Sequence, residues 1–441
     1  MELDPLLLSR IQFGLTIGFH FIFPPLSIGL AWLLVVVEGL GWRRGDEKYI
    51  RAGKFFGKIL GLTFVLGVAT GIVMEFQFGT NWAEYSKFVG DIFGAPLAAE
   101  AIFAFFIEST FLALYLFGRE RVSAGVHWFS ILMVSIGATI SAFWILIANS
   151  WQQTPAGYVV KNGRAELTDF HAAVFNASMW YRFFHMMNAC LICGGLLMAG
   201  VSAYLVLRNR DKAAAAKTLR LGLVVGALAS IMALFPTGHQ HARQVARTQP
   251  EKLAAFEGLI HTTKQAPLLV FGIPSENPPR IDYAVELPGM LSFLIFDDIN
   301  ASVEGIENLR EDGHPTPPLV PVFISFHLMV GLGTLFILLN LYGIWLLARG
   351  RLEKSPRYLR LLPWAIPLPL AACQLGWLVA EVGRQPWVVY RLLKTADAYS
   401  TNVSGAEILF STIAFSLIYA VLGALYLFLL LKMVKQGPDN A

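Results

Sequence analysis

The sequence predicts an all-α integral membrane protein with nine transmembrane helices, an N-terminus outside the membrane and a C-terminus in the cytoplasm. Three observations support this prediction. Of the 441 residues, 56% are hydrophobic and only 15% are charged, a balance that is typical of membrane proteins. Nine apolar runs approach or exceed the length of about 20 residues that a helix needs to cross a hydrocarbon core. Basic residues are concentrated in alternate connections between these runs.

The apolar runs are separated by short polar connections, apart from two longer segments at 150–177 and 237–318. The first run is too long for a signal peptide, so we expect it to be retained as a helix. The chain thus divides into six helices over 1–236, a periplasmic loop over 237–318 and three helices over 319–441. The helices are predicted at about 11–40, 55–78, 95–117, 125–149, 178–207, 219–236, 319–348, 362–382 and 405–432.

The basic residues predict which side of the membrane each connection faces. The segments that follow the first, third, fifth, seventh and ninth runs hold 20 of the 34 Lys and Arg residues. By the positive-inside bias these segments are cytoplasmic, so the longer 237–318 segment lies outside. It is polar and rich in proline, and a loop of this length is usually either functional or disordered.

Composition also excludes several classes of protein. The net charge is only +4 and no block of basic residues suggests a nucleic-acid partner. Three cysteines exclude a disulfide framework, and Cys190 and Cys193 lie inside an apolar run, where packing is their expected role. The expected partners are therefore lipid and other membrane components.

One stretch, from Trp377 to Trp387, places an acid and a base at the end of the eighth run. Glu381 and Arg384 are three residues apart and would share a face of a helix, which Gly383 and Pro386 then end. Ionisable residues at membrane depth are costly and are functional candidates by default. The pair is either a structural clamp or the partner of a charged group in the bundle, such as a metal centre.

Other spans also carry residues that a bilayer disfavours, namely His20, Glu100, Glu108, His185 and Met329. A single His or Met in a helix is more often a packing residue than a ligand. The set, however, indicates a cofactor, because imidazole and thioether are axial ligands of low-spin haem iron. Imidazole with carboxylate can also bind iron and leave a position open for oxygen. Two carboxylates on one helix, predicted about 80° apart around its axis, are typical of a proton relay.

At these residues the chain resembles subunit 1 of the cytochrome bd ubiquinol oxidases, over almost its whole length. The 237–318 segment is similar to the short form of the family's Q-loop, and the histidines at its start are similar to the cyanide-insensitive branch. The matching stretches are Ser9–Phe13, Gly67–Trp82, Gly90–Leu97, Phe105–Phe111, Lys252–Glu257 and Gly383–Trp387.

The resemblance implies axial ligands for three haems. His185 and Met329 match the ligands of the low-spin haem b558, whereas His20 and Glu381 match the ligands of two high-spin haems. These two are haem b595 and haem d, or a further haem b in place of haem d, and the resemblance does not assign which ligand holds which. Trp377 and Arg384 match residues beside the haems and their propionates, and His327 stands where well-known members have Arg.

The resemblance also implies a proton path and a quinol site. Glu100, Glu108 and Ser141 match residues that carry protons toward the high-spin haems. Lys252 and Glu257 match the pair implicated in quinol binding. The implied enzyme is a quinol:oxygen oxidoreductase of the bacterial inner membrane, which generates proton motive force without pumping. A second large membrane subunit and a very small single-helix subunit are its implied partners.

Two other functions fit part of the pattern. A membrane b-type cytochrome that reduces quinone would share the His and Met ligands but would not need Glu100, Glu108 and Glu381 together. A proton-coupled secondary transporter would use buried acids and histidines, but we expect paired repeats with interrupted helices in such a protein. A haem spectrum separates the three hypotheses.

Overall fold

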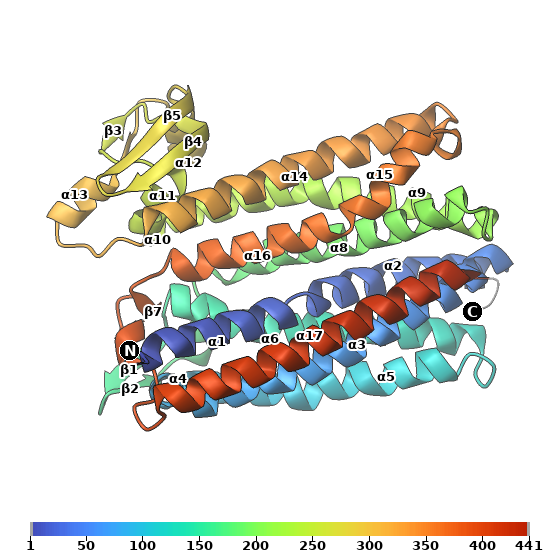
Figure 1. Ribbon diagram of the computed structural model, residues 1–441, viewed down its shortest axis with the longest axis horizontal. Helices are drawn as coiled ribbons and strands as arrows, with labels where there is room; N and C mark the ends of the chain where they lie inside the picture. The colour runs from blue at the N-terminus through green and yellow to red at the C-terminus, as the bar shows by residue number, and fades with distance from the viewer. Residues whose placement is uncertain (1–2, 439–441) are drawn as a thin grey trace.

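The computed structural model describes residues 3–438, most of which form long helices running along one axis (Figure 1). Within this range nine helical segments are long and apolar enough to span a membrane, which confirms the predicted number. They are Pro5–Arg44, Glu47–Thr80, Ala83–Phe117, Ala124–Gln153, Met179–Leu207, Lys212–Thr248, Leu319–Ala348, Pro356–Val382 and Gly405–Gln436.

Five of these segments are continuous α-helices, and four are interrupted. The continuous ones are α3 (Glu47–Thr80), α6 (Ala124–Gln153), α8 (Met179–Leu207), α14 (Leu319–Ala348) and α17 (Gly405–Gln436). The interrupted ones are α1 (Pro5–His20) with α2 (Phe23–Arg44), α4 (Ala83–Ala99) with η1 (Glu100–Phe105) and α5 (Phe106–Phe117), α9 (Lys212–Met232) with η2 (Ala233–Gly238) and α10 (His239–Thr248), and α15 (Pro356–Ala365) with α16 (Pro367–Val382).

Four of the predicted single runs are interrupted, and prolines lie at three of the interruptions. Pro24 and Pro25 occupy the first turn of α2, and Pro367 begins α16. Pro236 lies inside η2, a π-helical turn. Since η2 continues directly into α10, the sixth span ends at Thr248 and not at the predicted residue 236. The segment predicted to start the outer loop is therefore helical.

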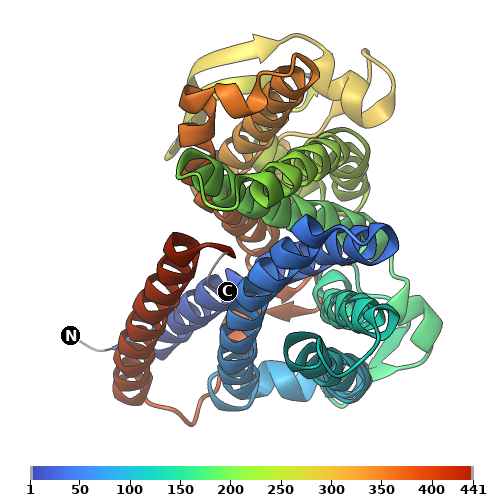
Figure 2. The same cartoon turned by 90° about the vertical axis from the view of Figure 1, so that its right-hand side faces the viewer.

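The helices pack around α2 and α8, which cross at a pair of glycines. A Cβ atom on Gly29 would lie 1.9 Å from the carbonyl oxygen of Cys190, and one on Gly194 would lie 2.4 Å from the backbone of Gly29. Only glycine permits this approach, which brings the helix that follows His20 beside the helix that carries His185. Around this crossing, α2 also contacts α3 and α6, α8 contacts α9, and α14 contacts α9 and α16. Helix α17 packs on α1 and α3 at the edge of the bundle (Figure 2).

The two ends of the bundle differ in character. The N-terminal end of α1 lies beside the short strands, and the C-terminal end of α17 lies at the far end of the long axis (Figure 1). The strands at the first end form antiparallel pairs, β1 (Tyr158–Lys161) with β2 (Arg164–Leu167) and β7 (Trp387–Val389) with β8 (Leu393–Lys394). Short helical turns complete the connections at both ends: α7 (Phe170–Val174), η3 (Leu352–Lys354) and η4 (Thr395–Asp397).

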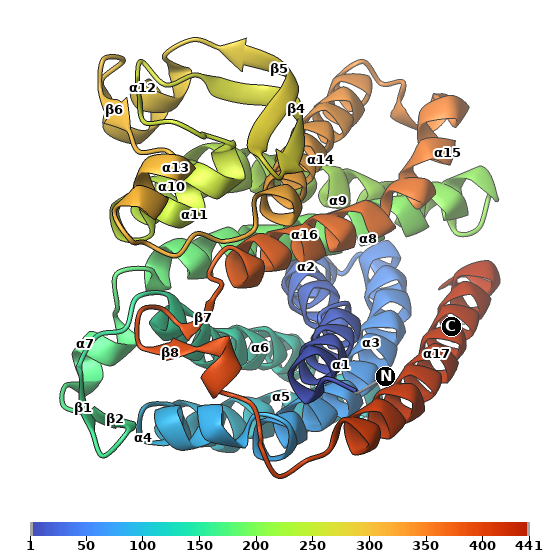
Figure 3. The same ribbon diagram turned by 60° about the vertical axis from the view of Figure 1, so that its left-hand side comes forward.

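Residues 249–318, predicted as a loop, form a small folded unit against α10 and α14 (Figure 3). Its apolar core includes Phe256, Ile295 and Ile306, together with Phe323 of α14. This core explains why a long, proline-rich connection is ordered here. The unit consists of α11 (Pro250–Glu257), β3 (Thr263–Lys264), β4 (Leu268–Glu276), β5 (Pro279–Leu287), α12 (Met290–Phe296), β6 (Ser302–Val303) and α13 (Ile306–Glu311), with β4 paired to β5 and β3 to β6.

Candidate functional site

A large cavity runs between the helices and beneath the folded unit. Its volume is about 2140 Å³, whereas pockets for ordinary small ligands have roughly 300–1,000 Å³. Most of its wall is apolar, and the polar groups on it come from helices far apart in the sequence. All the predicted site residues line it: His20, Glu100, Glu108, Ser141, His185, Lys252, Glu257, His327, Met329, Trp377, Glu381 and Arg384.

His20 is the last residue of α1, at the break before the prolines of α2. Its Nδ1 atom lies 3.0 Å from the hydroxyl of Thr70. That hydroxyl donates to the carbonyl of Leu66 at 2.8 Å and so can only accept from the imidazole. The hydrogen of a neutral His20 is therefore on Nδ1, and its Nε2 keeps a lone pair for a metal ion. A Cβ atom on Gly71 would lie 3.2 Å from the ring, so glycine leaves space for this imidazole.

His185 on α8 has a similar neighbour. Its Nδ1 atom lies 3.5 Å from the hydroxyl of Thr237, which donates to the carbonyl of Met232 at 2.9 Å. Thr237 belongs to the π-helical turn η2, so this turn places the hydroxyl next to the ring. The contact is longer than that of His20 but favours the same tautomer, with Nε2 free to bind a metal.

Met329 on α14 faces the cavity beside a glycine of α16. A Cβ atom on Gly376 would lie only 2.8 Å from the Met329 sulfur. Any larger residue at this position would displace the thioether. The sulfur of Met329 and the imidazole of His185 thus reach the same cavity from two different helices.

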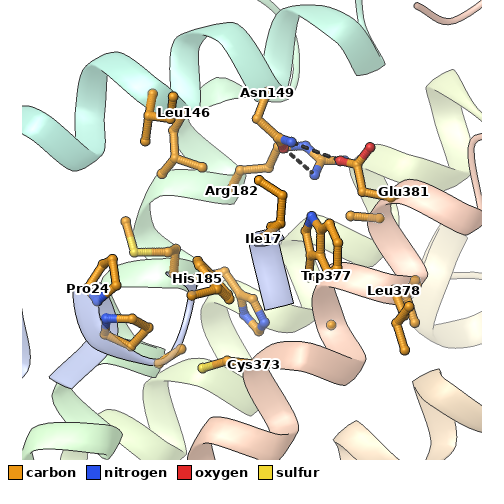
Figure 4. A pocket seen from close by; sticks show the side chains of 18 of the residues that line it. Ile17, Pro24, Leu146, Asn149, Arg182, His185, Cys373, Trp377, Leu378 and Glu381 are labelled. Carbon is orange, nitrogen blue, oxygen red and sulfur yellow. Dashed lines mark hydrogen bonds between the residues drawn. The ribbon is translucent and has the colours of Figure 1, made fainter. Parts of the chain in front are cut away.

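Glu381 lies near the end of α16 and is held by hydrogen bonds from two sides. Arg384 forms an ion pair with its Oε2 atom. Asn149 of α6 donates to its Oε1 atom at 2.9 Å (Figure 4). Arg384 is itself buried and also donates to Gln152 at 3.1 Å. Trp377 is one helical turn before Glu381 and faces the same cavity (Figure 4). The spacing of Glu381 and Arg384 predicted the acid–base pair, whereas the contact with Asn149 depends on the packing of α6 against α16.

The carboxylates of the third span are arranged differently from the prediction. Glu100 begins the π-helical turn η1, which lies between it and Glu108. Such a turn adds one residue to the helix, so the predicted 80° separation becomes roughly 20°. The correction places both carboxylates on nearly one face. Ser141 of α6 donates to Glu100 at 2.7 Å. Glu75 of α3, which is not among the predicted site residues, also lines the cavity.

Lys252 and Glu257 lie on α11, outside the membrane-spanning segments, and both are buried. The ammonium of Lys252 donates to Gln153 at 2.5 Å, to Gln249 at 2.9 Å and to the carbonyl of Ala380 at 3.1 Å. Burial, followed by the nearby guanidinium of Arg182, holds the pKa of Lys252 well below its usual value. These three acceptors are neutral, and no carboxylate of residues 3–438 accepts a hydrogen bond from Lys252.

Glu257 has an incomplete set of hydrogen bonds. Burial raises the pKa of its carboxyl group to about 8, so most of it is protonated at neutral pH. Its Oε2 atom has no partner among residues 3–438, although the atom is shielded from solvent. A buried acid without a partner is a candidate for exchanging a proton with a ligand in the cavity.

His327 links α14 to the folded unit. Its two ring nitrogens lie 3.0 Å from the carbonyl oxygens of Phe323 and Leu269. Leu269 belongs to β4, so the ring connects the hairpin to the helix that carries Met329. Both hydrogen bonds can form at once only when both nitrogens carry hydrogen, since carbonyl oxygens only accept.

The donor set fits haem better than a bare metal ion. In the described part of the chain no group of three or more His, Cys, Asp or Glu residues is arranged to hold a metal ion. Instead, single donors stand apart on the wall of one large apolar cavity. This is what a macrocycle requires, because it brings four equatorial donors and takes only axial ligands from the protein.

Comparisons with known proteins agree over nearly the whole chain. The family described as "Cytochrome bd terminal oxidase subunit I" matches residues 8–438. The chain is 40% identical over 446 residues to the cytochrome bd ubiquinol oxidase subunit 1 of Bacillus subtilis (strain 168), covering 99% of this chain and 95% of the relative. It is 34% identical over 502 residues to the cytochrome bd-II ubiquinol oxidase subunit 1 of Escherichia coli (strain K12), covering 99% and 97%. A chain of the bd oxidase from Geobacillus thermodenitrificans superposes with a TM-score of 0.92 at 29% identity, covering 98% and 99%.

Proposed function

Because the chain belongs to the cytochrome bd terminal oxidase subunit I family, we propose that its large cavity holds the haems and that four side chains on the wall are their axial ligands. Membership makes the protein a subunit of a terminal quinol oxidase, which oxidises quinol and reduces oxygen. It is a multi-pass protein of the bacterial cytoplasmic membrane that works with haem and with a partner subunit. The quinone reductase and transporter hypotheses are therefore set aside.

His185 and Met329 would hold the low-spin haem b558. Two threonine hydroxyls support the roles of the histidines, since each favours the tautomer with a free Nε2 atom. His20 and Glu381 would hold the two high-spin haems, namely haem b595 and haem d, or a further haem b in place of haem d. When bound, the haems supply electron transfer and, at an open iron position, the reduction of oxygen. The observation that carries the proposal is that these four donors, from four helices, line one cavity.

Quinol would bind beneath the folded unit, against α11. Lys252 would donate to a quinol oxygen in exchange for one of its three present acceptors. The carboxyl group of Glu257 accepts a quinol proton once it is ionised. The raised pKa of Glu257, about 8, supports this role because such a group exchanges protons near neutral pH. Its unpartnered oxygen supports an open position for the substrate.

Protons for water would travel along the third span. Glu108 passes a proton to Glu100, because the π-helical turn η1 brings the two carboxylates to nearly the same face of the helix. Ser141 donates a hydrogen bond to the receiving carboxylate at 2.7 Å. Arg384 forms an ion pair with Glu381 beside this path. Quinol protons leave at the end that carries the folded unit, and protons for water enter at the other end. The resulting charge separation needs no pump.

The topology and the partners follow the same proposal. The connections rich in Lys and Arg belong to the end of the bundle opposite the folded unit, which would place this unit in the periplasm, the N-terminus outside and the C-terminus inside. The division into helices 1–6, Q-loop and helices 7–9 is retained, with the helical part of the sixth span extended. The partner would be a second large membrane subunit, accompanied by a small single-helix subunit.

A reduced-minus-oxidised optical spectrum, combined with pyridine haemochrome analysis and quinol-dependent oxygen uptake, tests the proposal. We expect haem b signals and oxygen consumption, with a red-shifted chlorin band where haem d is present. His20→Ala and Glu381→Ala should each lose one high-spin haem and keep the low-spin α-band. A complex without haem, or two variants with the full haem content, would overturn the ligand assignment.

A further inference from the structure

Arg182 of α8 is a buried cation that its protein neighbours satisfy poorly. It is 7% exposed and lines the cavity. Its guanidinium makes one hydrogen bond within residues 3–438, from Nη1 to the side-chain oxygen of Asn149 at 3.4 Å. Its Nε atom is buried without a partner. A guanidinium has five N–H donors, and burying it with a single long bond to a neutral amide is costly unless an anion completes the site.

No carboxylate of residues 3–438 forms a hydrogen bond with Arg182, although Glu381 lies close enough to interact with its charge. Asn149 also donates to Glu381, so the amide lies between Arg182 and that carboxylate (Figure 4). Glu381 is already paired with Arg384. Lys252 adds a further cation whose acceptors are all neutral. This part of the cavity wall thus holds more positive than negative groups, and they are arranged around the space in which a ligand would lie.

The position of Arg182 indicates which anion completes the site. Arg182 precedes His185 by three residues on α8, so the guanidinium and the imidazole lie on one face, about a turn apart. A planar guanidinium binds carboxylate oxygens in a two-pronged manner. We propose that Arg182 binds a propionate carboxylate of the haem held by His185 and Met329. This inference rests on the proposed haem ligation.

The proposal has an electrochemical consequence. A permanent positive charge beside a haem favours the reduced iron, because the reduced form carries one positive charge fewer. His327 stands two residues before Met329, where well-known members of the family have Arg. Arg182 provides a permanent cation on the opposite ligand helix. It is therefore a positioning residue that also tunes the potential of the low-spin haem.

The test compares Arg182→Gln and Arg182→Lys with wild type in the purified complex. Haem content per chain and the midpoint potential of the low-spin α-band are measured by spectroelectrochemical titration. In Arg182→Gln we expect a partial loss of low-spin haem. At a fixed electrode potential, the ratio of reduced to oxidised low-spin haem should fall by about tenfold relative to wild type. Arg182→Lys should restore most of both.

Arg243→Gln is the matched control, since Arg243 lies in the same outer region but pairs with Asp297 and does not line the cavity. It should leave the low-spin potential unchanged. An Arg182→Gln variant with the wild-type potential and haem content would overturn the inference, as would a change confined to the high-spin haems. If Arg182→Gln does not accumulate, redox-difference infrared spectra of Arg182→Lys replace it, and an unaltered propionate carboxylate band overturns the proposal. Absence of haem from the wild-type complex would instead contradict the proposed function.

Discussion

Two groups of buried ionisable side chains, in two regions of the bundle, differ in how well they are satisfied. The inner cluster, Glu38, Tyr115, Arg119 and His127, joins α2, α5, the turn after α5 and α6. Glu38 accepts from Tyr115 at 2.9 Å, pairs with Arg119 and lies 3.8 Å from the ring of His127. The second nitrogen of His127 lies 3.0 Å from the carbonyl oxygen of Tyr115. None of the side-chain nitrogen or oxygen atoms of this cluster is buried without a partner.

The cavity cluster, which consists of Arg182, Glu257 and His241 of α10, contains similar residue types with incomplete hydrogen bonds, and all three residues line the cavity. Buried atoms of Arg182, His241 and Glu257 have no partner within the described chain. Both clusters lie within or against an apolar bundle, so burial alone does not separate a structural group from a functional one. The two clusters differ in their hydrogen bonding. Protein neighbours supply the hydrogen-bond partners of the inner cluster, whereas the cavity cluster needs a ligand to supply the missing ones.

The largest expected effect is a loss of quinol oxidation without a loss of stability, when Glu257 of the cavity cluster is replaced. Glu257→Gln keeps the volume and removes the proton acceptor. Quinol oxidation should fall by about 100-fold or more, the usual contribution of a general base, while haem content and thermal stability stay near wild type. Glu286→Gln, on the exposed strand β5 of the same folded unit, is the control and should retain activity. A Glu257→Gln enzyme with normal turnover would contradict the role.

The pH dependence of the wild-type enzyme tests the same carboxyl group. Because its pKa is raised to about 8, Glu257 is mostly protonated at pH 7 and becomes a base as the pH rises. When quinol oxidation is rate-limiting, the rate should therefore increase by roughly tenfold between pH 7 and pH 9 and level off above that. The increase should disappear from the residual activity of Glu257→Gln. A rate that falls over this range would exclude Glu257 as the base.

A substitution in the inner cluster should lower the stability of the protein and leave the haem spectrum unchanged. Glu38→Gln leaves Arg119, whose side chain is 25% exposed, without its carboxylate. We expect a loss of about 3 kcal/mol in unfolding free energy, the lower end for a broken buried pair, with an unchanged low-spin spectrum in the folded fraction. Thermal unfolding in detergent measures it against Glu47→Gln, whose side chain is 85% exposed. Loss of the haem spectrum without loss of stability would remove the distinction between the clusters.

A threonine beside His20 provides a smaller effect. Thr70→Val keeps the shape and removes the hydroxyl that accepts from Nδ1, so the haem on His20 should bind about tenfold more weakly. Thr70→Ser should restore binding. Thr63→Val, on the same helix but bonded to Tyr426, is the matched control. Haem retention during dilution or competition separates the variants, and equal retention in Thr70→Val and Thr63→Val would argue against the role of Thr70.

The smallest expected effect concerns Glu251, a buried acid that precedes Lys252 and whose hydrogen-bond partners the protein supplies. Glu251 accepts from Tyr390 and from Arg391, each at 2.8 Å, and thereby joins α11 to the connection after α16. Glu251→Gln should raise the KM for quinol by about threefold through looser positioning of α11. Turnover at saturation and haem content should not change. Steady-state oxygen uptake over a range of quinol concentrations measures both, and a change in turnover alone would argue for a direct role in the chemistry.

Hydropathy and spacing predicted the nine spans, because each apolar run exceeds what a soluble helix needs. They did not predict the π-helical turn after Glu100, since π-helical hydrogen bonding has no clear signature in residue type. They also did not predict that residues 249–318 form a folded unit. Its strands are short, and its core forms with Phe323, which lies beyond the segment itself.

The ligand candidates could be predicted because His, Met and Glu are unusual at membrane depth. Arg182, Asn149 and Thr70 were not singled out, since their importance depends on contacts between different helices. No property of a single residue in the sequence reveals that the Nε atom of Arg182 lacks a partner. Whether a buried polar atom has a hydrogen-bond partner depends on the tertiary structure, and this property separates the two clusters.

One pair of variants tests the central claim most directly. His185→Ala removes a histidine of the cavity, and His127→Ala removes one of the inner cluster. Reduced-minus-oxidised spectra of the two purified complexes should show the low-spin α-band lost in His185→Ala and kept in the folded fraction of His127→Ala. A low-spin band that persists in His185→Ala, or disappears equally in both, would contradict the assignment of the cavity as the haem site.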